Sequence, residues 1–265
     1  MMKNKALINL SFDDGRIDNY NILYPLLKKY NLSATLNITT GFVRGESRLK
    51  RLAPTEPMNV DMVKEMFQDP LVEIASHGYY HLNTKEDILK GQKELLKDLN
   101  VEMLTQYGNG FASPGTDLNL DEYQEMKQEL NASHLEYVRL SLRYLSYPIL
   151  KTYLRKASRL LKWPFLYRLA YQDTLMSHVE NGILYSIPVL SSIKVSELKA
   201  IINEAESTGK VCILMFHSIV EDGKLRDNWD YERTKFTDLC EFLVRERDEQ
   251  RLDVVTSMDI YQRLK

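Results

Sequence analysis

The chain alternates short apolar runs with longer segments of helical periodicity from one end to the other, and this alternation constrains its fold more than any other feature. Strands that alternate with helices are joined by crossover connections, which place the strands parallel to one another. Seven or eight such units predict an α/β fold, a distorted (β/α)7-8 barrel, in preference to an open sheet. The strand-like runs are 6–12, 33–38, 71–75, 137–140, 183–187, 211–216 and 253–256, with a further strand end at 110–115.

Length and composition favour a single globular domain over residues 1–265. The formal net charge of -2 argues against a general nucleic-acid-binding protein. Cys212 and Cys240 are too few for a disulfide framework or a four-thiolate zinc site, so we expect buried free thiols. No apolar run approaches the roughly 18 residues of a membrane-spanning helix. The apolar stretch after Lys5 is too short for a signal peptide, and the expected location is the cytoplasm.

The first apolar run ends abruptly in Asp13 and Asp14, which are followed by Gly15. Adjacent carboxylates repel each other, and a fold that keeps both ionised needs a cation or a shared proton beside them. The simpler interpretation is that Asp-Gly forms a turn and that Asp14 caps the following helix. The pair alone does not decide between a cation site and a simple turn, so the residues at the other strand ends have to be considered.

Polar residues also follow other predicted strands, and the carboxyl ends of barrel strands converge in space. His77 and His81 have the H-x-x-x-H spacing of many zinc sites, and one added carboxylate gives a catalytic ligand set with an open position. Asp14 is the expected carboxylate. Taken singly, either histidine is better explained as an ordinary surface or core residue. The residues at these other strand ends are His77, His81, Ser113, Pro114, Gly115 and His217.

Two of these stretches together resemble the motifs of the polysaccharide deacetylases of carbohydrate esterase family four. Residues 11–15 (SFDDG) are similar to that family's S/T-F-D-D-G turn, and residues 76–81 (SHGYYH) are similar to the loop that carries its H-S/T-x-x-H motif. Residues 111–115 (FASPG) and 214–217 (LMFH) resemble the looser third and last motifs. The resemblance runs in the right order from residue 6 to about residue 256. It implies a distorted barrel of the polysaccharide deacetylase type.

The resemblance also implies an activity, which is the metal-dependent hydrolysis of an N-acetyl group on an amino sugar in a glycan or glycolipid precursor. By position, Asp14, His77 and His81 would hold Zn²⁺ or another divalent metal such as Co²⁺ or Ni²⁺. Zinc lowers the pKa of bound water to about 7 and polarises the acyl oxygen. The chemistry of amide hydrolysis agrees with this assignment.

Amide hydrolysis needs one proton transfer to a base and another from an acid. The resemblance assigns the general base to Asp13 and the general acid, which protonates the leaving amine, to His217. It assigns the oxyanion contact to the backbone N–H of Gly115, and it places Pro114 and Ser113 in the same substrate-binding turn. His217 at this strand end also has a simpler explanation as a core histidine.

The sequence departs from the family pattern at two places. Ala112 stands where the third motif usually begins with an arginine that orients the catalytic carboxylate. An acid that tunes the last histidine is not evident near 183–192, and Glu221 or Asp222 is the expected replacement. Three alternatives stay open: an O-acetyl esterase, a deformylase or amidase on the same fold, and a catalytically silent carbohydrate-binding protein. The complete set of acids and histidines argues against the silent protein.

A basic and aromatic insertion is predicted at about 141–178, and the stretch 139–176 carries most of its charge. This composition suits peripheral contact with an anionic membrane, including the inner membrane face. It equally suits a helical pair that packs its aromatic residues on the barrel or on a second subunit. The overall charge disfavours nucleic acid as a partner, and the oligomeric state is not indicated. The residues concerned are Arg139, Arg143, Lys151, Arg155, Lys156, Arg159, Lys162 and Arg168, against Asp173, with Tyr144, Tyr147, Tyr153, Trp163, Phe165, Tyr167 and Tyr171 interleaved.

Overall fold

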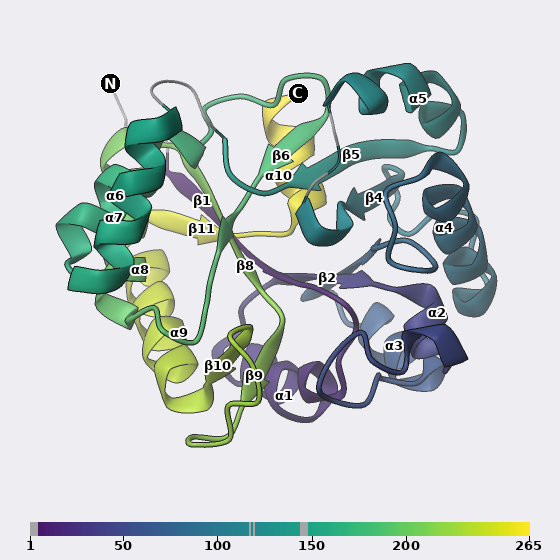
Figure 1. Cartoon of the computed structure of the whole chain (residues 1–265), viewed down its shortest axis with the longest axis horizontal. Helices are drawn as coiled ribbons and strands as arrows, with labels where there is room; N and C mark the ends of the chain where they lie inside the picture. The colour runs from purple at the N-terminus through teal and green to yellow at the C-terminus, as the bar shows by residue number, and fades with distance from the viewer. Residues whose placement is uncertain (1–4, 117, 119, 144–147) are drawn as a thin grey trace.

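A computed structural model describes residues 5–116, 118, 120–143 and 148–265. Nine strands of this described part form one sheet, in which every pair of neighbours is parallel (Figure 1). Eight follow the order β6-β5-β4-β3-β2-β1-β8-β7, and β11 pairs with β1. The strands are β1 (Ala6–Phe12), β2 (Ala34–Ile38), β3 (Val72–Ser76), β4 (Asn109–Ala112), β5 (Leu135–Leu140), β6 (Ile183–Tyr185), β7 (Ile187–Pro188), β8 (Val211–Phe216) and β11 (Leu252–Val254).

The barrel is closed by one continuous segment, because β6 and β7 stand at opposite ends of the strand order and only Ser186 separates them. The first half of this segment pairs with β5, where the Ser186 amide donates to the carbonyl of Leu140 at 3.1 Å. The second half pairs with β8, where the Val189 amide donates to the carbonyl of Met215 at 2.8 Å. The predicted distorted parallel barrel is therefore confirmed.

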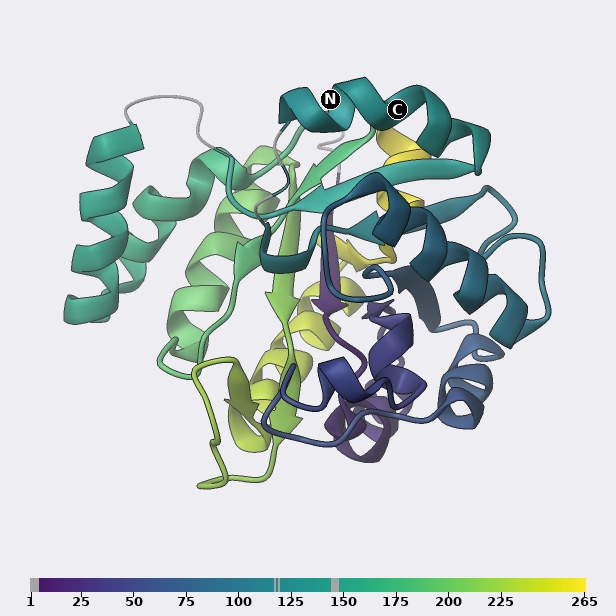
Figure 2. The same cartoon turned by 45° about the vertical axis from the view of Figure 1, so that its right-hand side comes forward.

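The helices cover the barrel in two groups, with α6 to α9 on one side and α2 to α5 on the other (Figures 1 and 2). Helical periodicity in the sequence predicts helices at 19–30, 59–68, 85–99, 121–130, 196–208, 235–249 and 257–264, and most of these are present within one or two residues. The helices are α1 (Tyr24–Tyr30), α2 (Thr40–Val43), α3 (Val60–Phe67), α4 (Lys85–Leu99), α5 (Leu120–Ala132), α6 (Pro148–Leu161), α7 (Pro164–Tyr171), α8 (Val195–Thr208), α9 (Arg233–Asp248) and α10 (Ser257–Leu264). Four single-turn or π-helical pieces are 19–23, 47–49, 114–116 and 172–174.

Local signals explain several helix ends. The side chain of Asn59 accepts from the amide of Met62 at 2.9 Å and caps α3. Gly209 ends α8 in the left-handed conformation, with φ of 62°. The sequence pattern places Glu197 on the polar face of α8, but the residue is fully buried, and its carboxylate accepts from the amide of Lys194 at 2.9 Å. A capping role in the first turn of α8 therefore outweighs its polarity.

The core aligns the ends of β1 and β8. Phe12 and Phe216 are register partners on these strands, and their buried rings stack with centroids 5.2 Å apart. The amide of Asp13 then donates to the carbonyl of Phe216 at 3.0 Å. Since Asp13 and His217 directly follow these rings, the core packing brings both residues to the same end of the barrel.

Two short strands after β8 were not predicted. β9 (Ser218–Val220) pairs in parallel with β10 (Asp230–Glu232), and together they form a small second sheet beside the barrel. Three residues are too few to show a period in the sequence. None of the helices in the described ranges combines the length and apolarity that crossing a bilayer requires. Cys212 and Cys240 are buried free thiols, as expected.

Candidate active site

Asp13 and Asp14 lie at the carboxyl end of β1, and each is only 2% exposed. Asp14 has a φ of 76° and Gly15 a φ of 88°, so the chain turns through two successive left-handed residues. Aspartate tolerates this conformation better than most residues, and glycine adopts it without steric cost. The sharp turn directs the two neighbouring carboxylates to different partners.

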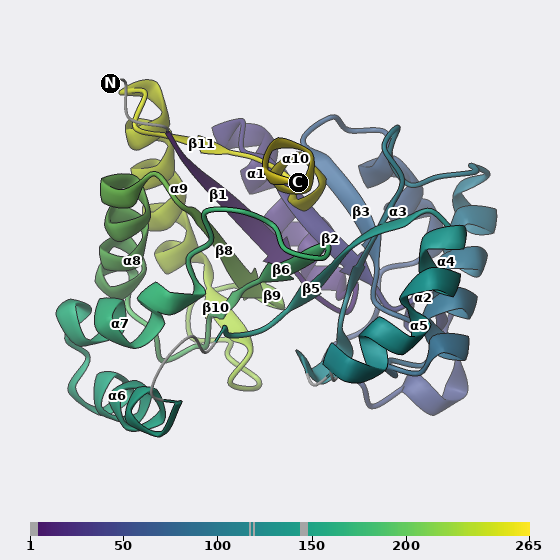
Figure 3. The same cartoon turned by 90° about the horizontal axis from the view of Figure 1, so that it is seen from above.

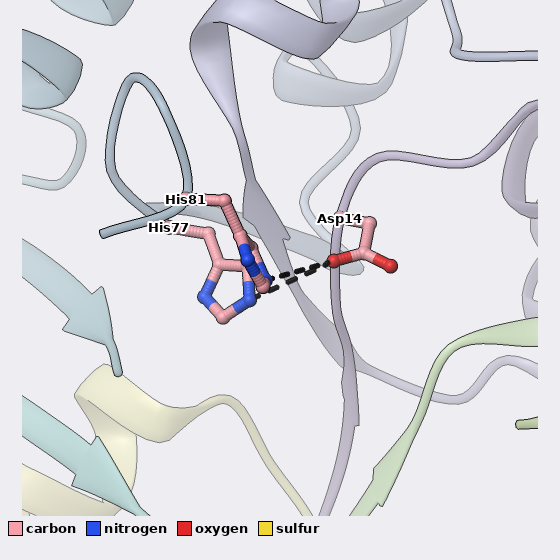
Figure 4. Close-up of side chains that lie close together, drawn as sticks. All are labelled: Asp14, His77 and His81. Atoms are coloured by element: carbon pink, nitrogen blue, oxygen red, sulfur yellow. Dashed lines mark ion pairs between the residues drawn. The ribbon is translucent and has the colours of Figure 1, made fainter. Parts of the chain in front are cut away.

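Asp14 faces the two histidines predicted to accompany it (Figure 4). Its Oδ1 lies 3.7 Å from Nε2 of His77 and 3.5 Å from Nε2 of His81. Ligand atoms held about 2 Å from a tetrahedral ion stand about 3.3 Å apart, so these spacings suit one shared cation. The same Oδ1 is buried and has no hydrogen-bond partner among the described atoms. A divalent metal is the group that this donor set fits best.

The protonation of the two histidines suits metal binding. Nδ1 of His77 donates to the backbone carbonyl of Ala112 at 2.8 Å, which leaves the lone pair of Nε2 free to point at Asp14. Burial lowers the pKa of both His77 and His81, despite the nearby carboxylates. Neutral imidazoles are the form that binds a metal.

The second oxygen of Asp14 has a different partner, which the sequence analysis missed. Oδ2 accepts from Nε of buried Arg16 at 3.0 Å. Arg16 also lies 3.7 Å from the carboxylate of Asp230 in β10 and 3.5 Å from that of Asp227. Burial alone raises the pKa of Asp14, but the charges of His217 and Arg16 lead the effects that lower it below its usual value. Asp14 is therefore ionised, with one oxygen directed at the histidines.

Helix α4 holds the loop that carries His77 and His81, and sequence motifs gave no sign of this support. The carboxylate of Asp87 accepts from the amides of Tyr79, Tyr80 and Leu82 at 3.1, 2.8 and 3.0 Å. Three amides of this loop are thus fixed by one buried side chain in the first turn of α4. The interactions constrain the loop that bears both imidazoles.

Side chains from β5 and β2 bind the carboxylate of Asp13. Nη2 of Arg139 donates to both carboxylate oxygens at 2.7 Å, and Nδ2 of Asn37 donates to Oδ1 at 2.8 Å. Burial by itself raises the pKa of Asp13. The charges of Arg139, His77 and His217 and the Asn37 hydrogen bond outweigh that effect and lower the pKa to about 2. Asp13 is consequently ionised at neutral pH.

Arg139 supplies the guanidinium that the family's third motif usually has at the position of Ala112. The two residues are register partners on β5 and β4, so Arg139 projects from the strand next to the one that carries the family's arginine. It is fully buried, and its Nη1 also donates to Oγ of Ser186 in the segment that closes the barrel, at 2.9 Å. The carboxylate partner expected at position 112 is therefore supplied by the adjacent strand. In the sequence, this role of Arg139 is indicated only by its position at the end of the strand-like run 137–140.

His217 follows β8 and is half-buried beside Trp229, with ring centroids 4.5 Å apart. Its Nδ1 has no hydrogen-bond partner in the described chain. The expectation that Glu221 or Asp222 tunes this histidine is wrong. Glu221 is exposed and pairs with Arg233, and Asp222 is exposed and bonds Thr234. Burial dominates the pKa of His217 and lowers it, against the raising effect of Asp14 and Asp13.

A cavity of about 210 Å³ brings the two acids and three histidines together with Gly115. Gly115 has a φ of 59° and borders the cavity, as the third motif predicts. Ser113 and Pro114 lie behind the turn instead, because both bond Asn83: the Ser113 hydroxyl donates to Oδ1 at 3.0 Å, and the Pro114 carbonyl accepts from Nδ2 at 2.9 Å. The cavity lining is Asp13, Asp14, Arg16, Leu52, His77, His81, Gly115, Met215, His217, Asp227 and Trp229.

The site combines two imidazoles and one carboxylate with an adjoining cavity, at the carboxyl end of a parallel barrel. This combination is typical of a metal site that keeps one coordination position open. Comparison with known proteins specifies the family. Residues 2–152 match the polysaccharide deacetylase family, and the chain belongs to it.

Similar proteins were found both by sequence and by structure. A poly-beta-1,6-N-acetyl-D-glucosamine N-deacetylase from Staphylococcus aureus is 34% identical over 101 residues, which cover 36% of this chain and 33% of the relative. The match thus spans a third of the relative's length. Among solved structures, the Bc1960 peptidoglycan N-acetylglucosamine deacetylase is 12% identical with a TM-score of 0.55, over 98% of this chain and 90% of that one. A family 4 acetyl xylan esterase from Clostridium thermocellum is 13% identical with a TM-score of 0.50, over 97% and 90%. These two structures support the fold.

Proposed function

We propose that this chain is a metal-dependent deacetylase that hydrolyses the N-acetyl group of an amino sugar within a glycan or glycolipid precursor. The observation that carries the proposal is the shared geometry of Asp14, His77 and His81, whose donor atoms all lie within 4.8 Å of one another. Ionised Asp13 is adjacent to them in the same cavity. Family membership and the curated relative's N-deacetylase name support the choice of bond.

The charged residues in and behind the cavity can be assigned roles in this hydrolysis. A bound divalent cation would supply polarisation of the acyl oxygen and a more acidic attacking water. Asp13, with a pKa of about 2, is a weak base, and it can take a proton only from such an acidified water. Arg139 and Asn37 fix the carboxylate for that transfer. The water oxygen forms the new bond to the acyl carbon, while the C–N bond breaks.

The proton balance requires a donor for the leaving nitrogen. His217 lies in the same cavity as Asp13, and we assign it that role. Because burial lowers its pKa, His217 would have to gain its proton within the reaction cycle. The Gly115 amide, at the cavity wall, is assigned to the developing oxyanion. The products are acetate and the free amine.

A larger neighbouring cavity favours a glycan over a small acyl amide. It has a volume of about 810 Å³ and adjoins the catalytic cavity, since Leu52 and Asp227 line both. Residues 50–56 form one side, and Arg226 and Asp227 form the other. This polar cavity offers space for further sugars beside the one that reacts, and the longer substrate is therefore the first choice.

The test is acetate release by purified protein from an oligomer of β-1,6-linked N-acetylglucosamine, with O-acetylated xylan oligomers as the comparison. We expect release from the amide substrate, loss after chelation, and recovery with Zn²⁺, Co²⁺ or Ni²⁺. Asp13→Asn should keep its metal but lose turnover by about 100-fold or more, since it removes only the base. His77→Ala should lose both metal and turnover.

Three results would contradict the proposal. Equal metal loss in Asp13→Asn and His77→Ala would refute the division between base and ligand. Acetate release only from the ester would support the O-acetyl esterase instead. Oligosaccharide binding without release, in metal-loaded protein, would identify a silent carbohydrate-binding protein.

A further inference from the structure

Helix α6 presents its apolar side chains to solvent, which is the reverse of an ordinary surface helix. Eleven large apolar side chains are exposed in the described part of the chain, and seven of them lie between residues 149 and 165. Figure 3 shows α6 as the outermost helix on its side, with α7 between it and α8. These seven residues, called the α6–α7 apolar face below, are Ile149, Leu150, Tyr153, Leu160, Leu161, Trp163 and Phe165.

The face arises from helical spacing. Ile149, Tyr153 and Leu160 fall on one side of α6, at intervals of four and seven residues. Their exposed fractions are 75%, 64% and 81%. Trp163 and Phe165, at the start of α7, are each 59% exposed and continue the face past the end of α6. Monomeric soluble proteins rarely leave a contiguous apolar surface of this kind uncovered.

The buried side of α6 is polar and already has its partners. Nζ of Lys151 donates to the carbonyl of Leu169 at 2.7 Å and pairs with Asp173 at 3.0 Å. The guanidinium of Arg155 lies 5.3 Å from the ring centroid of Tyr171. Because these contacts fix which side of α6 faces α7, the outward direction of the apolar residues is a property of the packed helix. Arg139, Lys151 and Arg155 are buried, so they do not contribute to the basic surface that the sequence suggested.

We infer that the α6–α7 apolar face is a docking surface for an anionic lipid bilayer. Trp and Tyr side chains favour the boundary between headgroups and acyl chains, and apolar residues beside them enter the bilayer. The side chain of Lys156 is exposed, with its Nζ 5.8 Å from the ring centroid of Tyr153. Lys156 therefore lies beside the apolar face, where its ammonium group could contact lipid headgroups. Tyr144 and Tyr147 of the predicted segment lie outside the described residues.

Charge favours a bilayer over a second copy of this chain as the occupant. Residues 148–172 contain no acid, so two such faces packed together would bring the exposed Lys156 of each copy close to basic residues of the other. Anionic phosphate headgroups supply the negative charge that such a dimer would lack. This inference concerns where the protein acts, and it does not depend on the bond that the active site hydrolyses.

The experiment is flotation of the purified full chain with vesicles of phosphatidylcholine and phosphatidylglycerol in equal parts. Leu160→Asp should reduce the bound fraction about tenfold or more, because it places a charge where an apolar side chain would enter the bilayer. Leu120→Asp is the matched control, since Leu120 is 41% exposed at the start of α5, outside this face. It should bind as the wild type does. Lys156→Gln should weaken binding only when phosphatidylglycerol is present.

Unchanged circular dichroism and unfolding midpoint in Leu160→Asp would show that it remains folded. Wild-type protein that stays with the dense fractions would overturn the inference. An equal loss in the Leu160 and Leu120 variants would also overturn it, because binding would then not reside in this face. A concentration-dependent dimer that Leu160→Asp dissociates, with no vesicle binding, would assign the face to a second copy instead.

Discussion

Asp13 and Asp14 are consecutive and buried, so their charges would repel strongly unless each were compensated. The left-handed turn at Asp14 separates them, and each then meets its own guanidinium. Arg139 binds both oxygens of Asp13, whereas Arg16 binds only one oxygen of Asp14. The difference leaves one Asp14 oxygen facing the two histidines, whereas both oxygens of Asp13 are held by Arg139. Two chemically identical side chains thereby acquire different partners.

Arg139 is predicted to position Asp13 without taking part in metal binding. Arg139→Ala should lower kcat about 100-fold, because the catalytic carboxylate loses its fixed orientation. The metal content should be unchanged, since Asp14, His77 and His81 keep their contacts. Removing one partner of a buried ion pair costs about 3–5 kcal/mol of stability, so metal content, kcat and KM are measured below the unfolding midpoint. Arg139→Lys, which keeps the charge but loses the planar fork, is the milder variant.

The strand register offers a sharper control for the same prediction. Because Ala112 and Arg139 are partners across β4 and β5, the double variant Ala112→Arg, Arg139→Ala moves the guanidinium to the neighbouring strand at the same level. It should recover part of the lost kcat. Loss of metal in parallel with kcat in Arg139→Ala would instead make Arg139 part of the metal site.

Helix α4 is predicted to control metal affinity through the backbone of the histidine loop. Gly91 lies so close to this loop that an added Cβ would stand 2.4 Å from the carbonyl carbon of Gly78 and 2.6 Å from the amide nitrogen of Tyr79. Gly91→Ala should therefore displace His77 and His81 and weaken metal binding about 10- to 100-fold. Competition with a chelator of known affinity measures this loss.

The direction of the Gly91 effect is informative because helix propensity opposes it. Alanine stabilises a helix interior by about 1 kcal/mol relative to glycine, so a loss of metal affinity would come from the steric contact with the loop. Lys93→Ala, exposed on the same helix, is the control and should leave affinity unchanged. Wild-type affinity in Gly91→Ala would show that the loop adjusts without moving its imidazoles.

Periodicity predicted the long elements and missed those whose form depends on distant partners. The 85–99 and 257–264 helices agree with the structure to the residue. The strands β7, β9 and β10 have two or three residues each, too few to show a pattern. The strand-end rule brought Asp14, His77 and His81 together correctly. It did not pair Arg139 with Asp13, because that contact depends on the β4–β5 register, which shifts at 109–110.

Across the whole molecule, the two ends of the barrel have different polar interiors. The carboxyl end holds the candidate active site, and the amino end holds Glu73, which is 5% exposed. Its carboxylate accepts from the hydroxyls of Tyr137 and Thr35 at 2.7 and 2.8 Å and from the amide of Met258 at 3.1 Å. Strands β2, β3 and β5 are thus joined to the start of α10 by one acid. Burial raises the pKa of Glu73, even though these donors act in the opposite direction.

Glu73 is therefore predicted to make the stability of the whole barrel depend on pH. Its pKa is higher in the folded chain than the ordinary value of 4.5, so the folded state binds the proton more tightly than the unfolded state. The free-energy cost of ionising the buried Glu73 is absent below pH 4.5 and grows as the pH rises through the folded pKa, so the free energy of unfolding falls over that range.

Urea unfolding from pH 4 to pH 8 should show this fall in the free energy of unfolding in the wild type, and Glu73→Gln should remove it. Glu125→Gln, the same change at an exposed position on α5, should retain the wild-type slope. Parallel curves for the wild type and Glu73→Gln would mean that Glu73 has the same proton affinity in both states, in which case its three hydrogen bonds fully offset its burial.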